Sequence, residues 1–128
     1  MKMFDEFLIG SWVTYFDYKI MSQEDQMKRL AELGVNYHPF PFSWYEVETR
    51  DGLDDWKEID RLCQKYNILY GMVTTETKTG NSDEAFEKNI VYGKEMSDNL
   101  VVYYLFDEPR YDQISMLAKG VKKYREAD

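Results

Sequence analysis

Positions 100–109 read Leu-Val-Val-Tyr-Tyr-Leu-Phe-Asp-Glu-Pro and carry the strongest signal for the fold. The uninterrupted apolar and aromatic run 100–106 predicts a strand buried on both faces, because a strand with one wet face alternates polar and apolar residues. Pro109 ends this strand, since proline has no amide hydrogen to donate to a ladder. Strands buried on both faces are typical of parallel sheets covered by helices, so this stretch predicts an α/β fold.

Shorter apolar runs at 7–12, 35–38 and 68–73 predict three further strands. Helical periodicity separates them: one helix begins at Ser22, with Asp25 as its capping-box partner, and a second begins at Asp54 or Asp55. Ser82 is expected to cap a third helix, and a fourth follows Pro109. The inward stripes expected for the four helices are Met27, Leu30 and Ala31; Trp56, Ile59, Leu62, Cys63 and Tyr66; Phe86, Ile90 and Met96; and Ile114, Leu117, Ala118, Val121 and Tyr124.

The sequence therefore predicts four consecutive strand-helix units. Alternating units of this kind imply a parallel sheet with right-handed crossovers. Four consecutive β-α units are the parallel half of a (β/α)8 TIM barrel, which usually runs to ~250 residues. Residues 1–128 are expected to be a single (β/α)4 unit, the N-terminal half of a larger barrel domain. The alternative is a small flavodoxin-like sheet, although such sheets usually have about five strands.

Composition excludes several classes of function. The 128 residues include 24 acidic and 16 basic side chains, giving a net charge of −8, which disfavours nucleic-acid and anionic-membrane partners. The single cysteine, Cys63, cannot form an intrachain disulfide. No apolar run approaches the ~18 residues that a membrane span needs. If Met1 is the native start, the acids at positions 5 and 6 exclude a signal peptide and predict a cytoplasmic protein.

Active sites of parallel α/β folds gather at the carboxyl ends of the strands. Aromatic residues and carboxylates follow the predicted strands here, as a sugar-binding cleft would require. Glu108 is the candidate general acid, because hydrophobic neighbours would keep its carboxyl protonated near neutral pH. The residues expected to bind substrate beside it are Trp12, His38, Trp44, Tyr45 and Asp107.

Two of these assignments have structural alternatives. Asp107 and Glu108 could simply be acids in the first turn of the following helix, where they complement its dipole. His38, the only histidine, could be a hydrogen-bonded structural residue. It has no partners at metal-ligand spacing, so we expect no metal site, and no cofactor motif is present.

The Tyr-Leu-Phe-Asp-Glu-Pro-Arg run at 104–110, followed by a helix ending in Lys-Lys-Tyr-Arg-Glu-Ala-Asp at 122–128, resembles the fourth βα unit of TIM-barrel glycoside hydrolases. It is most similar to beta-galactosidase-like and related barrel proteins of gut bacteria. The Ile-Gly-Ser-Trp run at 9–12 and the Leu-Gly-Val-Asn run at 33–36 are similar to the first two units of the same barrels.

This resemblance implies that Glu108 is the acid/base of a retaining glycosidase. In that clan an asparagine usually precedes the glutamate, whereas Asp107 stands here. The clan's nucleophile follows strand 7, which lies beyond this half. The resemblance therefore implies a carbohydrate-active fragment that is inactive alone and is completed by a C-terminal half-barrel or by a homodimer partner. The alternatives are a non-catalytic carbohydrate-binding fragment and a flavodoxin-like interaction or regulatory module.

Overall fold

The computed structural model of the chain describes residues 7–11, 21–39, 41, 52–72, 83–103 and 110–127. These residues form a mixed α/β structure with a three-stranded parallel sheet, so the predicted α/β class is confirmed. The elements are α1 (Gln23–Glu32), β1 (Tyr37–His38), α2 (Leu53–Tyr66), β2 (Leu69–Met72), α4 (Asp83–Gly93), β3 (Leu100–Tyr103), the 3-10 turn η2 (Tyr111–Gln113) and α5 (Ile114–Ala127).

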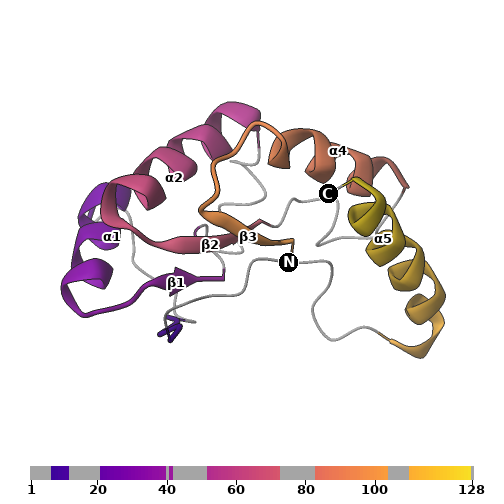
Figure 1. Cartoon of the computed structure of the whole chain (residues 1–128), viewed down its shortest axis with the longest axis horizontal. Coiled ribbons are helices and arrows are strands. Elements are labelled where there is room, and N and C mark those ends of the chain that lie inside the picture. The colour runs from indigo at the N-terminus through magenta and orange to yellow at the C-terminus, as the bar shows by residue number, and fades with distance from the viewer. Residues whose placement is uncertain are drawn as a thin grey trace.

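The strands lie in the order in which the chain makes them, β1-β2-β3. Segment 7–11 extends this order, because Gly10 forms a parallel bridge with Tyr37 of β1. The amide of Asn36 holds the segment in place: its Oδ1 accepts from the Ile9 amide at 2.7 Å, and its Nδ2 donates to the Phe7 carbonyl at 3.0 Å. Figure 1 shows α1, α2, α4 and α5 following one another in an arc along one side of the sheet.

Helix α1 begins as the sequence predicts. The Ser22 hydroxyl accepts a hydrogen bond from the Asp25 amide at 3.1 Å and donates one to the Asp25 carboxylate at 2.7 Å, which satisfies an amide at the helix start. Met27 and Leu30 are buried, as expected. Gly34 follows the helix with a φ of 80°, a left-handed conformation that favours glycine and lets the chain turn into β1.

The predicted start of α2 is wrong. Neither Asp54 nor Asp55 is its N-cap: the cap is Gly52, without a side-chain hydrogen bond. Both acids lie in the first turn instead, where their charge complements the positive end of the helix dipole. The inward face is confirmed, because Trp56, Ile59, Leu62 and Cys63 are all buried.

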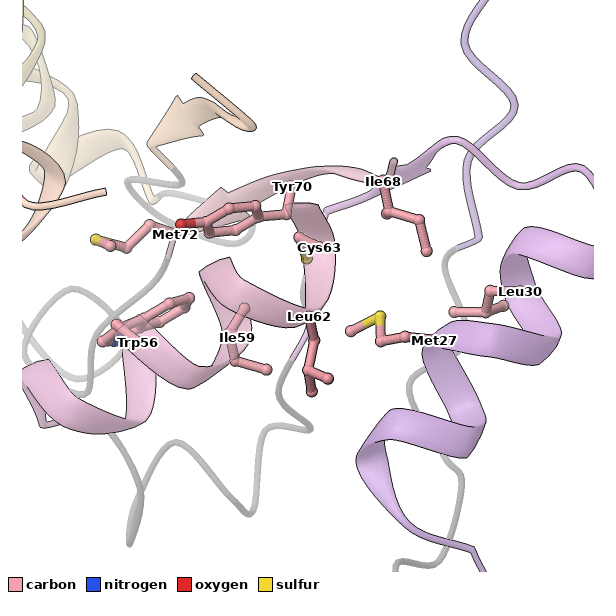
Figure 2. Close-up of a cluster of buried hydrophobic side chains, with 9 residues drawn as sticks. All are labelled: Met27, Leu30, Trp56, Ile59, Leu62, Cys63, Ile68, Tyr70 and Met72. Atoms are coloured by element: carbon pink, nitrogen blue, oxygen red, sulfur yellow. The ribbon is translucent and has the colours of Figure 1, made fainter. Parts of the chain in front are cut away.

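One cluster of buried side chains joins α1, α2 and β2. Figure 2 shows Met27 and Leu30 of α1 facing the inner side of α2, with the Tyr70 ring of β2 lying over Trp56. The ring centroids of Tyr70 and Trp56 are 6.4 Å apart. The cluster comprises Met27, Leu30, Trp56, Ile59, Leu62, Cys63, Ile68, Tyr70 and Met72.

The predicted face of α5 is confirmed at Tyr124, which is buried, but the observed face is rotated relative to the rest of the prediction. Its buried residues are Gly120 and Tyr124, whereas Ile114 is 53% exposed. The rotation follows from Phe86 of α4, whose ring packs against Gly120: a Cβ on Gly120 would lie only 2.6 Å from the ring. Ala118 is exposed, and Leu117 and Val121 are half-buried. Ser82, the predicted cap of α4, lies outside the described residues.

Candidate functional site

The carboxyl ends of the strands lie at one edge of the sheet, because all of them are parallel. At this edge β1 ends at His38, β2 at Met72 and β3 at Tyr103. Ser11 lies beside β1, where its amide donates to the Tyr37 carbonyl at 3.2 Å. This is the edge at which the sequence predicts a site.

Most of the predicted site residues lie in segments that follow these strand ends. Trp12, Trp44, Tyr45, Asp107 and Glu108 are outside the described residues, so their geometry stays a prediction. The helix that follows Pro109 bears on one alternative for the two acids. Its first turn is η2, beginning at Tyr111 with Arg110 as N-cap, so positions 107 and 108 precede the helix in the chain. The acid in that first turn is Asp112.

His38 is the one predicted site residue that the structure describes. It pairs with Tyr70 in the parallel ladder, and paired residues of a parallel ladder project to the same side of the sheet. Tyr70 projects toward α2, because its hydroxyl donates to the Asp60 carboxylate of that helix at 3.1 Å. His38 therefore faces the helix layer, and only 4% of its surface is exposed.

Burial also determines the protonation of His38. It lowers the pKa of the imidazole from 6.5 to about 4, because a charged ring would lose its hydration. The ring is therefore neutral at pH 7 and is not positioned to bond a dissolved sugar. Its environment favours the structural role that the sequence analysis left open.

Among the described residues, no helix covers the opposite face of the sheet (Figure 1). Tyr37, Leu69, Gly71 and Val102 project from it, since they alternate with the helix-facing residues and pair with one another. Val102 is 37% exposed, and partial burial raises the pKa of the Tyr37 phenol. Gly71 permits a close approach of the chain leaving β1, because a Cβ there would lie 2.5 Å from the Pro39 carbonyl oxygen.

A second polar centre, missed by the sequence analysis, lies toward the other edge of the sheet. The buried carboxylate of Asp60 accepts from the Tyr70 hydroxyl at 3.1 Å, from Gln64 Nε2 at 2.8 Å, and from both the hydroxyl and the amide of Ser97 at 2.6 and 3.1 Å. The sequence does contain a signal for this centre: Asp60 is four residues after Trp56 and therefore lies on the apolar face of α2. A lone acid on such a face predicts a buried polar network.

This centre suits a structural role. Each oxygen of Asp60 is already bonded to donors of the protein, which leaves little capacity for a substrate. Burial and the negative charge of Asp60 raise the pKa of the Tyr70 phenol and of the Cys63 thiol. Cys63 therefore stays a protonated thiol at neutral pH, which is a poor nucleophile.

A third polar group lies between α4 and α5. Asn89 is fully buried and donates from Nδ2 to the Tyr124 hydroxyl at 2.9 Å, while its Oδ1 has no donor among the described residues. Tyr124 stacks on Tyr103 of β3, with ring centroids 4.5 Å apart, and burial raises the pKa of its phenol. A small hollow beside them is lined by Ile90, Gly93, Lys94, Tyr103, Tyr124 and Ala127.

Within the described ranges, no group of three or more His, Cys, Asp or Glu side chains could hold a metal ion. None of the helices in that part of the chain combines the length and hydrophobicity needed to cross a bilayer. In comparisons with known proteins, no family model, no curated protein and no solved structure matches this chain.

Proposed function

We propose that the chain is half of a glycoside-hydrolase-like barrel and that it acts on carbohydrate when a second half completes it. The observation that supports this proposal is the strand order. Segment 7–11, β1, β2 and β3 follow one another in sequence order, all parallel, with the helices along one side. Consecutive βα units of a (β/α)8 barrel have this arrangement.

The strand order also separates the barrel from its flavodoxin-like alternative. In a flavodoxin-like sheet the strand nearest the amino terminus lies between the second and the third strands of the chain. In this chain that strand corresponds to segment 7–11, and β1 and β2 correspond to the second and the third. Here β1 pairs directly with β2, and segment 7–11 lies on the other side of β1. The observed pairing therefore favours the barrel.

In the proposed enzyme Glu108 protonates the glycosidic oxygen of the leaving group. In a retaining reaction a second carboxylate forms a glycosyl ester as that bond breaks, and Glu108 then takes a proton from the water that hydrolyses the ester; in an inverting reaction the second carboxylate activates the water instead. Asp107 accepts from a sugar hydroxyl, and the rings of Trp12, Trp44 and Tyr45 stack on the apolar faces of the sugar. His38 is not part of this proposal, because it is buried against the helix layer. The reaction needs a second carboxylate, ~5 Å from the first for retention or ~6.5–9.5 Å for inversion. A C-terminal half-barrel or a second copy of the chain would supply it.

The proposal is tested by sequencing the gene beyond the codon for Asp128 and by assaying the protein. We expect an open frame with four more strand-helix units and a glutamate at the end of a late strand. Expressed together, the two halves should hydrolyse a chromogenic glycoside from a nitrophenyl panel, and Glu108→Gln should abolish turnover. A frame that lacks such units, combined with a wild-type dimer that cleaves none of the panel, would contradict the proposal.

The second candidate is a carbohydrate-binding fragment without catalysis. The residue pattern favouring it is the same set of aromatic residues, which could bind sugar without an acid/base. The two candidates differ in the Glu108→Gln variant. Saccharide affinity that is unchanged in Glu108→Gln, lost in Trp44→Ala and never accompanied by turnover would identify the binding fragment.

A further inference from the structure

Strand β3 contains an irregularity that its own sequence does not explain. Leu100 pairs with Tyr70 of β2, but Gly71 pairs with Val102, so Val101 is an extra residue and forms a bulge. The chain here reads Leu-Val-Val-Tyr-Tyr at 100–104. Val101 and Val102 are both valine, so the same residue type lies opposite Gly71 whether or not the strand bulges, and the apolar pattern at this position does not select the bulged register.

The amino end of β3 is held by polar contacts to α2 and β2. Ser97 donates from both its hydroxyl and its amide to Asp60. Asn99 donates from Nδ2 to the carbonyls of Ile68 and Cys63 at 3.0 and 3.3 Å, and its own carbonyl accepts from the Tyr70 amide at 2.8 Å. These contacts set Leu100 opposite Tyr70.

The other end of β3 is held by Tyr103. Its ring stacks on Tyr124 of α5, and its hydroxyl lies against Gly93 of α4, where a Cβ would overlap it. This contact sets Tyr103 opposite Met72. Two residues lie between Leu100 and Tyr103, whereas only Gly71 lies between Tyr70 and Met72. The contacts at both ends of β3 can therefore form at the same time only if β3 contains a bulge.

We propose that Asp60, Ser97, Asn99 and Gly93 are positioning residues that impose the bulged register of β3. Side chains alternate along a strand, so the pairing of Tyr103 with Met72, which the contact with Gly93 holds, would set the direction in which the chain continues toward Asp107 and Glu108. Bulges beside active sites re-aim side chains in this way. The link to Glu108 rests on the proposed function, whereas the register itself does not.

Cross-strand amide-to-Cα-proton NOEs on labelled protein test the register directly. The wild type should show Gly71–Val102 and Tyr70–Leu100 contacts. In Ser97→Ala/Asn99→Ala the amino end is released, so the ladder should become regular, with Val101 replacing Leu100 opposite Tyr70. Ser97→Thr keeps the hydroxyl and should keep the bulge.

The opposite end provides an independent test. In Gly93→Ala, Tyr103 is displaced, so Leu100 should stay opposite Tyr70 while Val101 replaces Val102 opposite Gly71. Gly52→Ala is the matched control, since a Cβ there meets only the Asp55 carboxylate at 3.4 Å. Wild-type NOEs in both register variants would overturn the proposal. If one variant fails to fold, the NOEs of the other decide.

Titration of the same variants with lactose and cellobiose separates the register from the function. We expect Gly93→Ala, which changes the residue opposite Met72, to lose saccharide affinity, while Ser97→Ala/Asn99→Ala, Ser97→Thr and Gly52→Ala, which keep Tyr103 opposite Met72, retain it. A changed register in Gly93→Ala with unchanged affinity would overturn the link to Glu108. Failure of the wild type to bind either sugar would count against the proposed function, and the NOEs would still decide the register.

Discussion

Two regions of the molecule pack differently. In the first region α1 and α2 pack on β2, and in the second α4 and α5 pack on β3. The first region buries large aliphatic and aromatic side chains, and its buried carboxylate, Asp60, accepts four hydrogen bonds. The second region brings the ring of Phe86 against Gly120, and its buried amide, Asn89, has an oxygen without a donor among the described residues. The first region therefore gains stability from its polar group, whereas the second carries a cost.

This difference explains why one region was easier to predict than the other. Where large apolar residues recur at helical spacing, as on α2, the buried face follows from the pattern. Where a ring packs against a glycine, as between α4 and α5, the contact depends on the absence of a side chain. Hydrophobic periodicity cannot predict such a contact, because glycine does not count as an apolar position. Variants at the buried polar groups and at the packing contacts test whether the two regions differ in this way.

The largest effect is expected at Asp60. In Asp60→Ala the Tyr70 hydroxyl and the Ser97 amide lose their acceptor, so we expect a loss of about 3 kcal/mol in the free energy of unfolding. Asp60→Asn is the matched control: it keeps one acceptor oxygen and should lose about half as much. Urea unfolding followed by circular dichroism measures both. An Asp60→Ala variant as stable as the wild type would remove the basis of the comparison.

His38 adds a second buried polar group to the first region, with a distinct pH dependence. Its pKa is about 4 in the folded chain and 6.5 when exposed, so between these values the unfolded state binds more protons. Stability should therefore fall as the pH drops from about 6.5 toward 4, by up to about 3 kcal/mol from this residue.

Acidic groups titrate in the same range, so the measurement is a difference. The free energies of unfolding of the wild type and of His38→Gln are compared from pH 7 to 4.5. The variant should lose less stability than the wild type over this interval. Parallel pH profiles would show that the imidazole is not buried as described.

The sequence alone predicted the α/β class, the parallel sheet and the start of α1. It succeeded because Ser22 and Asp25 interact locally and because the face of α2 is made of large apolar residues. It failed at the α2 cap, since aspartate is a common capping residue, whereas Gly52 begins the helix without a side-chain hydrogen bond. It could not predict the bulge at Val101, for which we propose contacts from three helices, α2, α4 and α5.

The candidate site was less predictable than the fold. His38 follows a strand as expected, but the side to which it projects depends on the register of β1 against β2, which a single strand does not encode. Asp60 was missed because the helical stripe was identified from its apolar members alone. Glu108 remains a prediction that rests on its place after the 100–106 run and on the family resemblance.

A smaller effect is expected at Gly120 in the second region. Alanine normally stabilises a helix interior by about 1 kcal/mol relative to glycine. Here the added Cβ would collide with the Phe86 ring, and overpacking costs about 1–3 kcal/mol, so Gly120→Ala should be net destabilising. The loss caused by Gly120→Ala should be smaller in a Phe86→Leu background than in the wild type, because leucine leaves room for the added Cβ. A Gly120→Ala variant more stable than the wild type would contradict this packing.

The smallest effect is expected at Asn89, where replacing the buried polar side chain should cost much less than it does at Asp60. Asn89→Leu removes an acceptor that lacks a donor among the described residues, but it also removes the hydrogen bond to the Tyr124 hydroxyl. The two effects offset each other and leucine leaves no cavity, so the unfolding free energy should stay within about 0.5 kcal/mol of the wild type. Asn89→Ala leaves a cavity and should cost more, about 1 kcal/mol. A loss in Asn89→Leu as large as that in Asp60→Ala would mean that the Asn89 amide is satisfied and that the two regions treat buried polar groups alike.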